Sequence, residues 1–347
     1  MATQTNNRLP DVIVNAEDRP SEEGALKIFV LSILKHYPDP PPIYLICPNA
    51  TPEFEEWARG VSQVTLDKKP LDNASSFNVK PQTFERLFGL GYNQVFWFDN
   101  DIVIGPRFKE KIADRIASPL LVSEEPRMSQ HPEPATMAKA YGWELGRALP
   151  RVINGGLISL SSEHGEIISA WKEVLFSDEY RAYQMKPWYE RPAHIFGDQE
   201  VFTCLLCAKR FSHIPVTYLK EGEDIIQMFG PAGFMPGDRM RNAGAGLPPL
   251  VHSMGHKPWR APQAGAGLRQ RYNDLHGELS PYVYVAREVV GADIDDYPWL
   301  ERRSFVGGLM RAASGDNAAL AGLPLAVFDV AVRRMKRVFK IDQMRAS

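Results

Sequence analysis

Short apolar runs alternate with amphipathic stretches over the first hundred residues of this chain. The expected strands are 11–16, 43–47, 61–66 and 95–105, and the expected helices are 21–37, 53–59 and 84–90. Strands that alternate with helices build a largely parallel sheet covered by helices on both faces. We therefore expect an α/β fold with a mixed, mostly parallel central sheet.

The second half of the chain is less regular. A further strand is expected at 152–160, with helices near 166–176, 199–209 and 323–341, whereas 124–150, 221–249 and 265–284 have the composition of loops. This pattern predicts one large domain over residues 1–260, a C-terminal extension over 261–322 and a tail helix over 323–347.

Composition narrows the classes of function that this chain can have. It has 347 residues, of which 44% are hydrophobic and 24% charged, and its net charge is −2. The charge is uneven, because residues 301–347 carry nine Lys/Arg against four Asp/Glu, whereas residues 1–300 carry 31 against 38. An acidic body argues against nucleic acid as a partner, and the basic end permits contact with an anionic surface.

The chain lacks the sequence features of an exported or membrane-spanning protein. No apolar run approaches the roughly 20 residues that cross a bilayer, and the first residues are polar. Three cysteines cannot form a disulfide framework, and Cys204 and Cys207 lie in an apolar helical stretch without a second pair for zinc. We expect buried thiols and a cytoplasmic location.

Two carboxylates, Asp99 and Asp101, interrupt the apolar run 95–105. An unpaired buried carboxylate is costly, so a compensating cation is expected. Residues i and i+2 of a strand share a face, and open α/β sheets bind ligands where their strands end. Hard oxygen ligands suit Mg²⁺ or Mn²⁺. A solvated Asp-Asn-Asp turn is the alternative interpretation.

The same string also fits a different class of enzyme. An apolar strand ending in Asp-x-Asp-x-Val resembles the start of the haloacid-dehalogenase-like phosphatases, in which the first aspartate accepts a phosphoryl group and the second is a general acid. That family carries the motif on its first strand, whereas at least three expected strands precede Asp99 here. An Mg²⁺-dependent phosphatase that uses Asp99 and Asp101 stays an alternative.

A second informative string, HSMGHKPW, covers residues 252–259. His252 offers an imidazole ligand, and Gly255 lets the backbone approach a ligand closely. Lys257 supplies a point charge suited to phosphate. An ordinary surface loop would explain the string equally well.

Several strings, taken in order, resemble the retaining GT-A glycosyltransferases of the glycogenin and bacterial lipooligosaccharide galactosyltransferase type (glycosyltransferase family 8-like). The matching strings are DVIVNAED (11–18), FERL (84–87), FWFDND (96–101), INGGLISL (153–160), GDQEVF (197–202) and HSMGHKPW (252–259). The chain departs from that family in the single residue between Gly255 and Lys257, where two are common, and in the residues that follow the first strand.

The resemblance implies a metal-dependent transfer of a sugar from a UDP-sugar to a glycan, lipid-linked or other hydroxyl acceptor, with retention of anomeric configuration. It implies one Mn²⁺ or Mg²⁺ held by Asp99, Asp101 and His252, with Asp198 and Gln199 as the catalytic pair beside the donor sugar. The other donor-binding residues that it implies are Ala16, Glu17, Asp18, Lys80, Arg86, Asn100, Asn154, Gly155, Gly255 and Lys257. A protein of this fold that binds sugar nucleotide without turnover is the remaining alternative.

The tail, 323–341, interleaves apolar residues with Arg and Lys. Basic amphipathic helices of this kind lie on anionic membranes, which predicts a peripheral contact at the cytoplasmic face of the membrane. A packed helix with a solvated basic face has the same pattern. Both interpretations stay open at the level of sequence.

Overall fold

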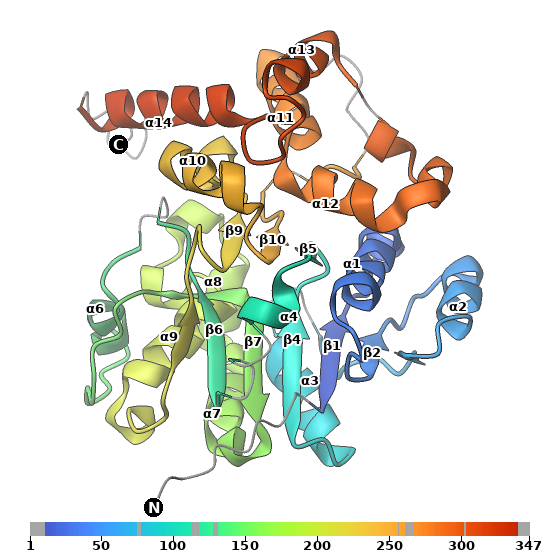
Figure 1. Ribbon diagram of the computed structural model, residues 1–347. Helices are drawn as coiled ribbons and strands as arrows, with labels where there is room; N and C mark the ends of the chain where they lie inside the picture. The colour runs from blue at the N-terminus through green and yellow to red at the C-terminus, as the bar shows by residue number, and fades with distance from the viewer. Residues whose placement is uncertain are drawn as a thin grey trace, which may run out of the picture.

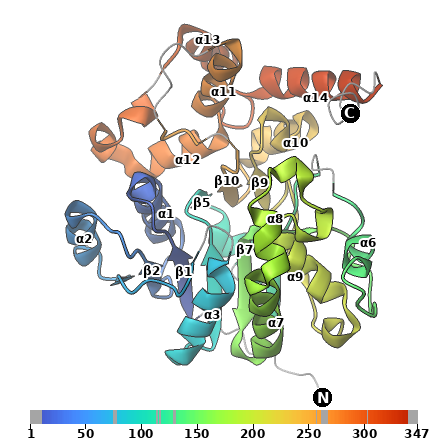
Figure 2. The same ribbon diagram turned by 180° about the vertical axis from the view of Figure 1, so that it is seen from behind.

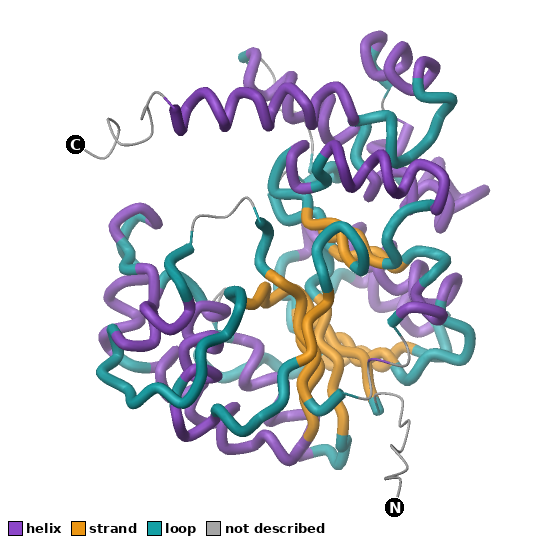
Figure 3. Tube along the Cα trace, turned by 60° about the vertical axis from the view of Figure 1, so that its left-hand side comes forward, coloured by secondary structure: helices purple, strands orange, loops and turns teal. Residues whose placement is uncertain are grey.

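The computed structural model of the protein describes residues 11–74, 78–112, 115, 118–127, 131–255, 257–260, 267–301 and 303–338. Its strands gather in the centre of the molecule with helices around them (Figure 1, Figure 3). The strands are β1 (Val12–Ala16), β2 (Ile43–Ile46), β3 (Val64–Asp67), β4 (Gln94–Phe98), β5 (Ile102–Ile104), β6 (Leu120–Glu124), β7 (Ile153–Ser161), β8 (Thr217–Leu219), β9 (Ile225–Gln227) and β10 (Leu250–His252). The helices are α1 (Glu23–His36), α2 (Pro52–Arg59), α3 (Val79–Gly89), α4 (Phe108–Lys111), α6 (Pro134–Lys139), α7 (Gly165–Phe176), α8 (Asp178–Gln184), α9 (Asp198–Cys207), α10 (Pro236–Ala245), α11 (Leu268–Glu278), α12 (Pro281–Val290), α13 (Phe305–Ala313) and α14 (Leu323–Val338).

Seven strands form one sheet in the order β3-β2-β1-β4-β7-β6-β8. All neighbouring pairs are parallel except those of β7, which runs antiparallel to both β4 and β6. The expected α/β fold with a mixed, mostly parallel sheet is therefore confirmed. Because β7 is reversed, its first residues lie beside the last residues of β4, where Phe98 pairs with Leu157.

Alternate side chains of the central strands pack on opposite faces of this sheet. Val12 and Val14 of β1 join a buried cluster with Phe84 of α3 and Trp171 of α7. Ile13, between them in sequence, joins a second cluster to which α1 contributes Leu26, Phe29, Val30 and Ile33. Figure 2 shows α3 and α7 in front of the sheet when the molecule is seen from behind. Both faces are thus covered, as a mostly parallel sheet requires.

The run 95–105 forms two strands in two sheets, which corrects the expectation of a single strand. β4 belongs to the large sheet, and β5 belongs to a small sheet of order β5-β10-β9. The chain turns at Asn100 and Asp101, between the two strands. The carboxylates cause the break, because aspartate and asparagine favour turns over a continuous strand.

Three segments that the sequence suggested as loops contain regular structure. β6 and α6 lie within or next to 124–150, and β9 and α10 lie in 221–249. The segment 265–284 holds α11 and the start of α12, where a loop was expected. Ser280 caps α12 by accepting a hydrogen bond from the Val283 backbone N–H. The local start signal, Ser before Pro, is present in the sequence, and seven of the ten residues of α12 are hydrophobic.

The C-terminal helices lie together at one end of the molecule (Figure 1). Tyr282 and Val285 of α12 share a buried cluster with Ile28 of α1, Val103 of β5 and Val251 of β10. The extension therefore packs on the body through apolar contacts, and its separation at residue 260 stays a prediction. In the part of the chain that the structure describes, no helix is long and apolar enough to cross a membrane.

Candidate functional site

A cavity of about 340 Å³ opens beside the ends of β1 and β4, the start of β7 and the first turns of α3 and α9; we call it the central pocket. The end of β10 and the loop after it close the remaining side. The predicted residues that line it are Ala16, Glu17, Lys80, Asp99, Asn100, Asp101, Asn154, Gly155, Asp198, Gln199, His252 and Lys257. The structure thus brings together most of the residues singled out from the sequence.

Asp99, Asp101 and His252 converge on one wall of the central pocket. One ligand atom from each lies within 4.8 Å of the others. The Asp99 backbone N–H donates to the Gly156 carbonyl over 2.7 Å, which fixes the end of β4 against β7. Trp97 Nε1 donates to Asp99 Oδ1, also over 2.7 Å, and orients that carboxylate.

The second aspartate and the histidine face each other without a hydrogen bond. Asp101 Oδ1 is buried and has no hydrogen-bond partner among the described residues, although His252 Nε2 lies only 3.1 Å away. Gln227 Nε2 donates to the Glu124 carbonyl, so Gln227 Oε1 faces His252 Nδ1, at 3.3 Å. An amide oxygen only accepts, so Nδ1 of a neutral imidazole carries the proton and the Nε2 lone pair points at Asp101.

This arrangement fits a divalent cation. While His252 is neutral, two lone-pair atoms held 3.1 Å apart repel one another, and either a metal ion between them or a proton on Nε2 removes that repulsion. Neighbouring ligands of an octahedral ion, with bonds of about 2.1 Å, are about 3 Å apart. Two carboxylates and one imidazole, the latter oriented by a second hydrogen bond, are ligands that Mn²⁺ or Mg²⁺ can use. Asp99, Asp101 and His252 could therefore hold such an ion.

Two lysines place positive charge in the same pocket. Lys257 Nζ donates to Asp101 Oδ2 and, over 2.6 Å, to the Ser253 carbonyl. Burial raises the pKa of Asp101, but the positive charges of His252, in its protonated state, and of Lys257 outweigh burial and hold this pKa well below its usual range. Lys80 Nζ donates to Asp198 Oδ2 over 2.8 Å and lies 3.9 Å from Asp99 Oδ1. Burial opposes the charge of Lys80, but these carboxylates raise its pKa above the usual value.

Gly155 and Gly156 of β7 allow the walls of the pocket to approach the backbone. A Cβ at Gly156 would lie 2.3 Å from His252 Cε1, so no side chain fits there while His252 keeps its place. A Cβ at Gly155 would lie 2.9 Å from Lys80 Nζ and 3.4 Å from Gln199 Cβ. Gly156 is therefore required by close packing, whereas a methyl group at 155 would mainly displace the flexible end of Lys80.

A network of amides and acids supports the side of the pocket formed by Asn154 and Gln199. Asn154 Nδ2 donates to Glu125 Oε2 over 2.8 Å, and Asn154 Oδ1 accepts from the Gly156 N–H over 3.0 Å. Gln199 Nε2 donates to Glu125 Oε2 over 3.1 Å and to Glu200 Oε1 over 3.0 Å, while its Oε1 accepts from the Gly155 N–H. Both amides are thus held in fixed orientations.

His131 joins the two acids of this network behind the pocket. Its Nε2 lies 3.5 Å from Glu125 Oε1, and its Nδ1 lies 3.6 Å from Glu200 Oε1. Burial raises the pKa of Glu200 to about 7, and its Oε2 has no hydrogen-bond partner among the described residues. Burial lowers the pKa of His131, but Glu125 and Glu200 outweigh it and raise this pKa. The cluster therefore binds a proton more readily than separate side chains would.

Acidic and amide groups form the end of the pocket beside β1. Glu17 accepts two side-chain hydrogen bonds of 2.7 Å from Arg19 and one of 2.8 Å from Asn100 Nδ2. Asn15 Nδ2 donates to the Phe98 carbonyl, and Asn15 Oδ1 is buried with no hydrogen-bond partner among the described residues. This end offers oxygen acceptors to a ligand, whereas the lysines offer positive charge nearer the metal ligands.

Three predicted residues lie outside the lining of the central pocket. Asp18 is exposed, and its carbonyl accepts from Asn49. Arg86 donates to Asp67 and to the Lys69 and Pro70 carbonyls, which ties α3 to the end of β3. Gly255 packs against the Phe229 backbone, where a Cβ would lie 3.1 Å from the Phe229 oxygen.

Other residues that shape the site were not found from the sequence. Gln227, Glu125 and His131 lie in segments that carry no motif, so only their contacts reveal them. Glu200 is within the string GDQEVF, beside the predicted pair, and could have been found there. The lining residues that were not singled out from the sequence are Asn15, Arg19, Glu22, Val79, Trp97, Gly156 and Met254. Asn15, Trp97, Gly156 and Met254 lie within the matching strings.

Comparison with known proteins gives weak similarities. No family model matches the chain, and no curated protein matches it significantly. A crystal structure of the galactosyltransferase LgtC with donor and acceptor sugar analogs shares 15% sequence identity over 82% of this chain and 99% of that chain, with a TM-score of 0.46. The WbbM bifunctional glycosyltransferase shares 13% over 87% of this chain and 53% of that chain, with a TM-score of 0.47. GlyE of Streptococcus pneumoniae shares 13% over 83% and 64%, with a TM-score of 0.41. Identities and TM-scores this low establish neither a family nor an activity, so the functional argument rests on the site.

Proposed function

We propose that this protein is a metal-dependent glycosyltransferase of the GT-A type that transfers a sugar from a UDP-sugar to a hydroxyl acceptor with retention of configuration. The observation that carries the proposal is the facing pair of Asp101 Oδ1 and His252 Nε2, 3.1 Å apart without a hydrogen bond, beside Asp99 and two lysines. A divalent ion with two basic groups suits a diphosphate. The order of the motifs along the chain supports the sugar nucleotide as the source of that diphosphate.

The diphosphate would lie between the metal ligands and the lysines. A bound Mn²⁺ or Mg²⁺ would act as a Lewis acid on the departing diphosphate. Lys257 is placed to neutralise charge on the leaving phosphate, and Lys80 adds a second positive charge near Asp99. Glu17, Asn100 and Ala16, beside the end of β1, would contact the nucleoside, with Asn15 as an added acceptor.

The donor sugar would lie against Asn154, Gly155, Asp198 and Gln199. Asp198 would bind sugar hydroxyls, and its charge is held by Lys80. Gln199 donates both amide hydrogens to Glu125 and Glu200. A bound sugar could therefore contact only the free lone pair of Gln199 Oε1. That group is a poor nucleophile. We infer a front-face transfer, in which the leaving phosphate accepts the proton of the acceptor hydroxyl; a covalent glycosyl-enzyme detected by mass spectrometry would overturn it.

The acceptor is proposed to be a glycan or a lipid-linked hydroxyl compound, and the protein is proposed to act in the cytoplasm, in peripheral contact with the membrane. The exposed side of α14 supports the membrane contact, because Val327, Phe328 and Met335 are exposed there together with Arg334 and Lys336. Residues 339–347, also part of the expected tail, lie outside the described residues. We keep the proposed division into a catalytic domain, an extension and a tail.

The two alternatives receive less support. The phosphatase would need Asp101 as a general acid, but His252 and Lys257 hold the pKa of Asp101 low, which keeps it charged. The acidic string also follows the fourth strand, beside antiparallel β7. An inactive sugar-nucleotide binder was suggested by the short loop between Gly255 and Lys257. Lys257 nevertheless reaches Asp101 and the pocket.

A thermal-shift experiment with purified protein tests the proposal. UDP or GDP is added with Mn²⁺, with Mg²⁺ or with EDTA. Ligand at a hundredfold excess over Kd stabilises the folded state by about 2.7 kcal/mol, which is visible in the melting temperature. A shift with UDP that requires the metal, and that Asp99→Asn removes, is expected. If no nucleotide shifts the melting temperature with either metal, the proposal fails, and release of phosphate from a phosphate ester is measured next.

A further inference from the structure

Helix α13 is held with its polar side inward and its apolar side outward. Ser304 caps the helix, accepting from the Gly307 N–H, and donates its own N–H and hydroxyl to Glu278 of α11. Arg311 is buried and donates to Glu278 Oε1 over 2.7 Å. Gly307 is packed so tightly against this carboxylate that a Cβ would lie 2.2 Å from Glu278 Oε1. The helix thus docks through this buried ion pair and through Met310, which packs against the apolar cluster of Leu279, Ala321 and Leu325.

The outward side of α13 is apolar along its whole length. Phe305 is 82% exposed and Leu309 is 56% exposed. The exposed residues of the helix are Phe305, Val306, Leu309, Ala312 and Ala313, at the spacing of one helical face. A surface helix of a protein that meets only water shows the reverse arrangement. Contiguous exposed apolar faces mark sites of interaction.

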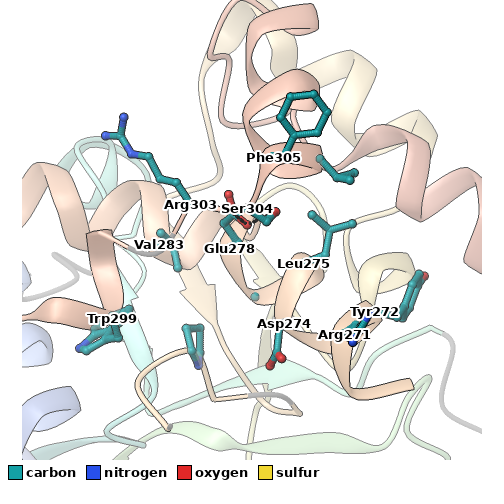
Figure 4. Close-up of a pocket in the computed structure, with 13 residues that line it drawn as sticks. Arg271, Tyr272, Asp274, Leu275, Glu278, Val283, Trp299, Arg303, Ser304 and Phe305 are labelled. Carbon is teal, nitrogen blue, oxygen red and sulfur yellow. Dashed lines mark hydrogen bonds between the residues drawn. The ribbon is translucent and has the colours of Figure 1, made fainter. Parts of the chain in front are cut away.

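The apolar surface continues from α13 across a pocket to α14. A cavity of about 690 Å³, the C-terminal pocket, lies between α11, α12 and α13, and Phe305 and Leu275 stand on one side of it with Trp299 on the other (Figure 4). Tyr272 of α11 also lines it, and its ring centroid lies 6.2 Å from that of Phe328 of α14. Phe328 is 59% exposed. One apolar strip therefore joins the two helices.

Positive charge borders this strip. Arg271 and Arg303 line the C-terminal pocket and are exposed, and Arg334 and Lys336 are exposed on α14. Two acids line the same pocket: Asp274 accepts from Gln270, and the charge of Glu278 is balanced by Arg311. The exposed acids nearby are Glu301 and Asp316, and Asp316 accepts from Tyr284. Apolar residues flanked by arginine and lysine are complementary to a bilayer with anionic headgroups. A second copy of the chain is less complementary, because a twofold contact would bring the same positive groups face to face.

We propose that α13 is a membrane-inserting element, with Phe305 and Leu309 entering the acyl region of an anionic bilayer and Arg271 and Arg303 at the headgroups. This inference extends the membrane contact proposed for α14 from the tail to the C-terminal extension. The loop that carries Lys257 continues into Pro258, which lines the C-terminal pocket. The surface that meets the bilayer is therefore linked through one short loop to the metal ligands and Lys257.

Sedimentation with vesicles tests the proposal, using the full chain. Vesicles of phosphatidylcholine with phosphatidylglycerol are compared with vesicles of phosphatidylcholine alone. The double variant Phe305→Ser with Leu309→Ser should bind the anionic vesicles at least about tenfold more weakly, since it removes two large apolar side chains from the inserted face. The control, Leu90→Ser with Met185→Ser, removes two exposed apolar residues elsewhere and should bind as the parent does.

Three other results would contradict the proposal. Unchanged binding of the α13 variant, together with weaker binding of Val327→Ser with Phe328→Ser, overturns the role of α13 and leaves the contact of α14. No binding of the parent overturns both membrane contacts, while the nucleotide thermal shift decides the transferase separately. A dimer that becomes a monomer in the α13 variant, measured by light scattering, shows that this face joins two copies and overturns the proposal.

Discussion

His252 Nε2 lies 3.1 Å from Asp101 Oδ1, and no hydrogen bond joins them. Gln227 fixes the other nitrogen of the imidazole, so the two facing atoms are both electron-rich in the neutral state of His252. Such a pair is costly while His252 is neutral and favourable around a metal ion, and without the metal a proton on Nε2 turns it into an ion pair. This relationship makes the site a candidate metal centre and leads to the first three predictions.

Removal of the central carboxylate should abolish metal binding. Asp101→Asn keeps the volume of the side chain but removes the charge, so the Kd for Mn²⁺ should rise by more than about 100-fold. Isothermal titration with Mn²⁺ measures it. The control, Asp18→Asn, changes an exposed carboxylate near the mouth of the pocket and should leave the affinity unchanged. Equal affinities in the parent and Asp101→Asn would remove Asp101 from the ligand set.

Gln227 should act as a positioning residue for His252. Gln227→Leu leaves His252 Nδ1 without its acceptor, so the imidazole loses its fixed orientation, and the affinity for Mn²⁺ should fall about 10- to 100-fold. Gln227→Glu keeps an acceptor at the same place and should lose less. Titration with Mn²⁺ measures both variants. If they weaken binding equally, the acceptor at Nδ1 is not what orients the ligand.

Gly156→Ala should weaken metal binding more than Gly155→Ala. The new methyl group at 156 would meet His252 Cε1 at 2.3 Å and displace the imidazole, whereas the one at 155 would mainly meet the flexible end of Lys80. The two variants add the same methyl group to the same strand, so each is the other's control. Titration with Mn²⁺ and a melting curve separate a local change from unfolding. Equal losses in the two variants would contradict this account.

The cluster of Glu125, His131 and Glu200 should make stability fall as pH rises. The pKa of Glu200 is raised from its ordinary value of 4.5 to about 7, and the pKa of His131 is also raised. A group whose pKa is raised by folding binds its proton more tightly in the folded state. Its contribution to the free energy of unfolding is complete below the pKa of the unfolded chain, and it is lost as the pH rises through the pKa of the folded state. Between about pH 5 and 8, the cluster should lose about 1–3 kcal/mol of stability.

Glu200→Gln tests this pH dependence, because it removes the titrating group and keeps the size of the side chain. The parent should lose more stability than Glu200→Gln between pH 5 and 8 in denaturant titrations. Glu223→Gln, at an exposed position, is the matched control and should follow the parent. A Glu200→Gln curve parallel to that of the parent over this range would show that Glu200 does not carry a raised pKa.

The order of strands and helices in the first half followed from local periodicity. The runs at 11–16 and 43–47 became β1 and β2, because a buried strand needs only a short apolar run bounded by turn residues. The prediction of one strand over 95–105 was wrong, since the apolar residues on the two sides of Asp99 and Asp101 belong to different sheets. Hydrophobicity alone does not show which sheet a short strand joins, because that depends on partners far along the chain.

The candidate metal ligands were proposed from the sequence, whereas the residues that orient them were not. Asp99 and Asp101 stand out because charged residues are rare in an apolar run, and His252 lies in a distinctive string. Arg86 matched a motif but ties α3 to β3 instead of lining the pocket. Gln227, Glu125 and His131 carry no local signal, since their roles come only from what they contact.

The sequence by itself determined the α/β alternation and the residues most suited to bind a cation, because both are local properties of the chain. Only the tertiary structure brought Lys257 to Asp101, which is 156 positions away, and turned the imidazole of His252 toward the same carboxylate. It also decided that α13 exposes its apolar side, since the ion pair of Arg311 with Glu278 joins two helices that the sequence does not connect. Long-range contacts of this kind depend on the packing of the whole sheet and its helices, and periodicity along the chain carries no information about them.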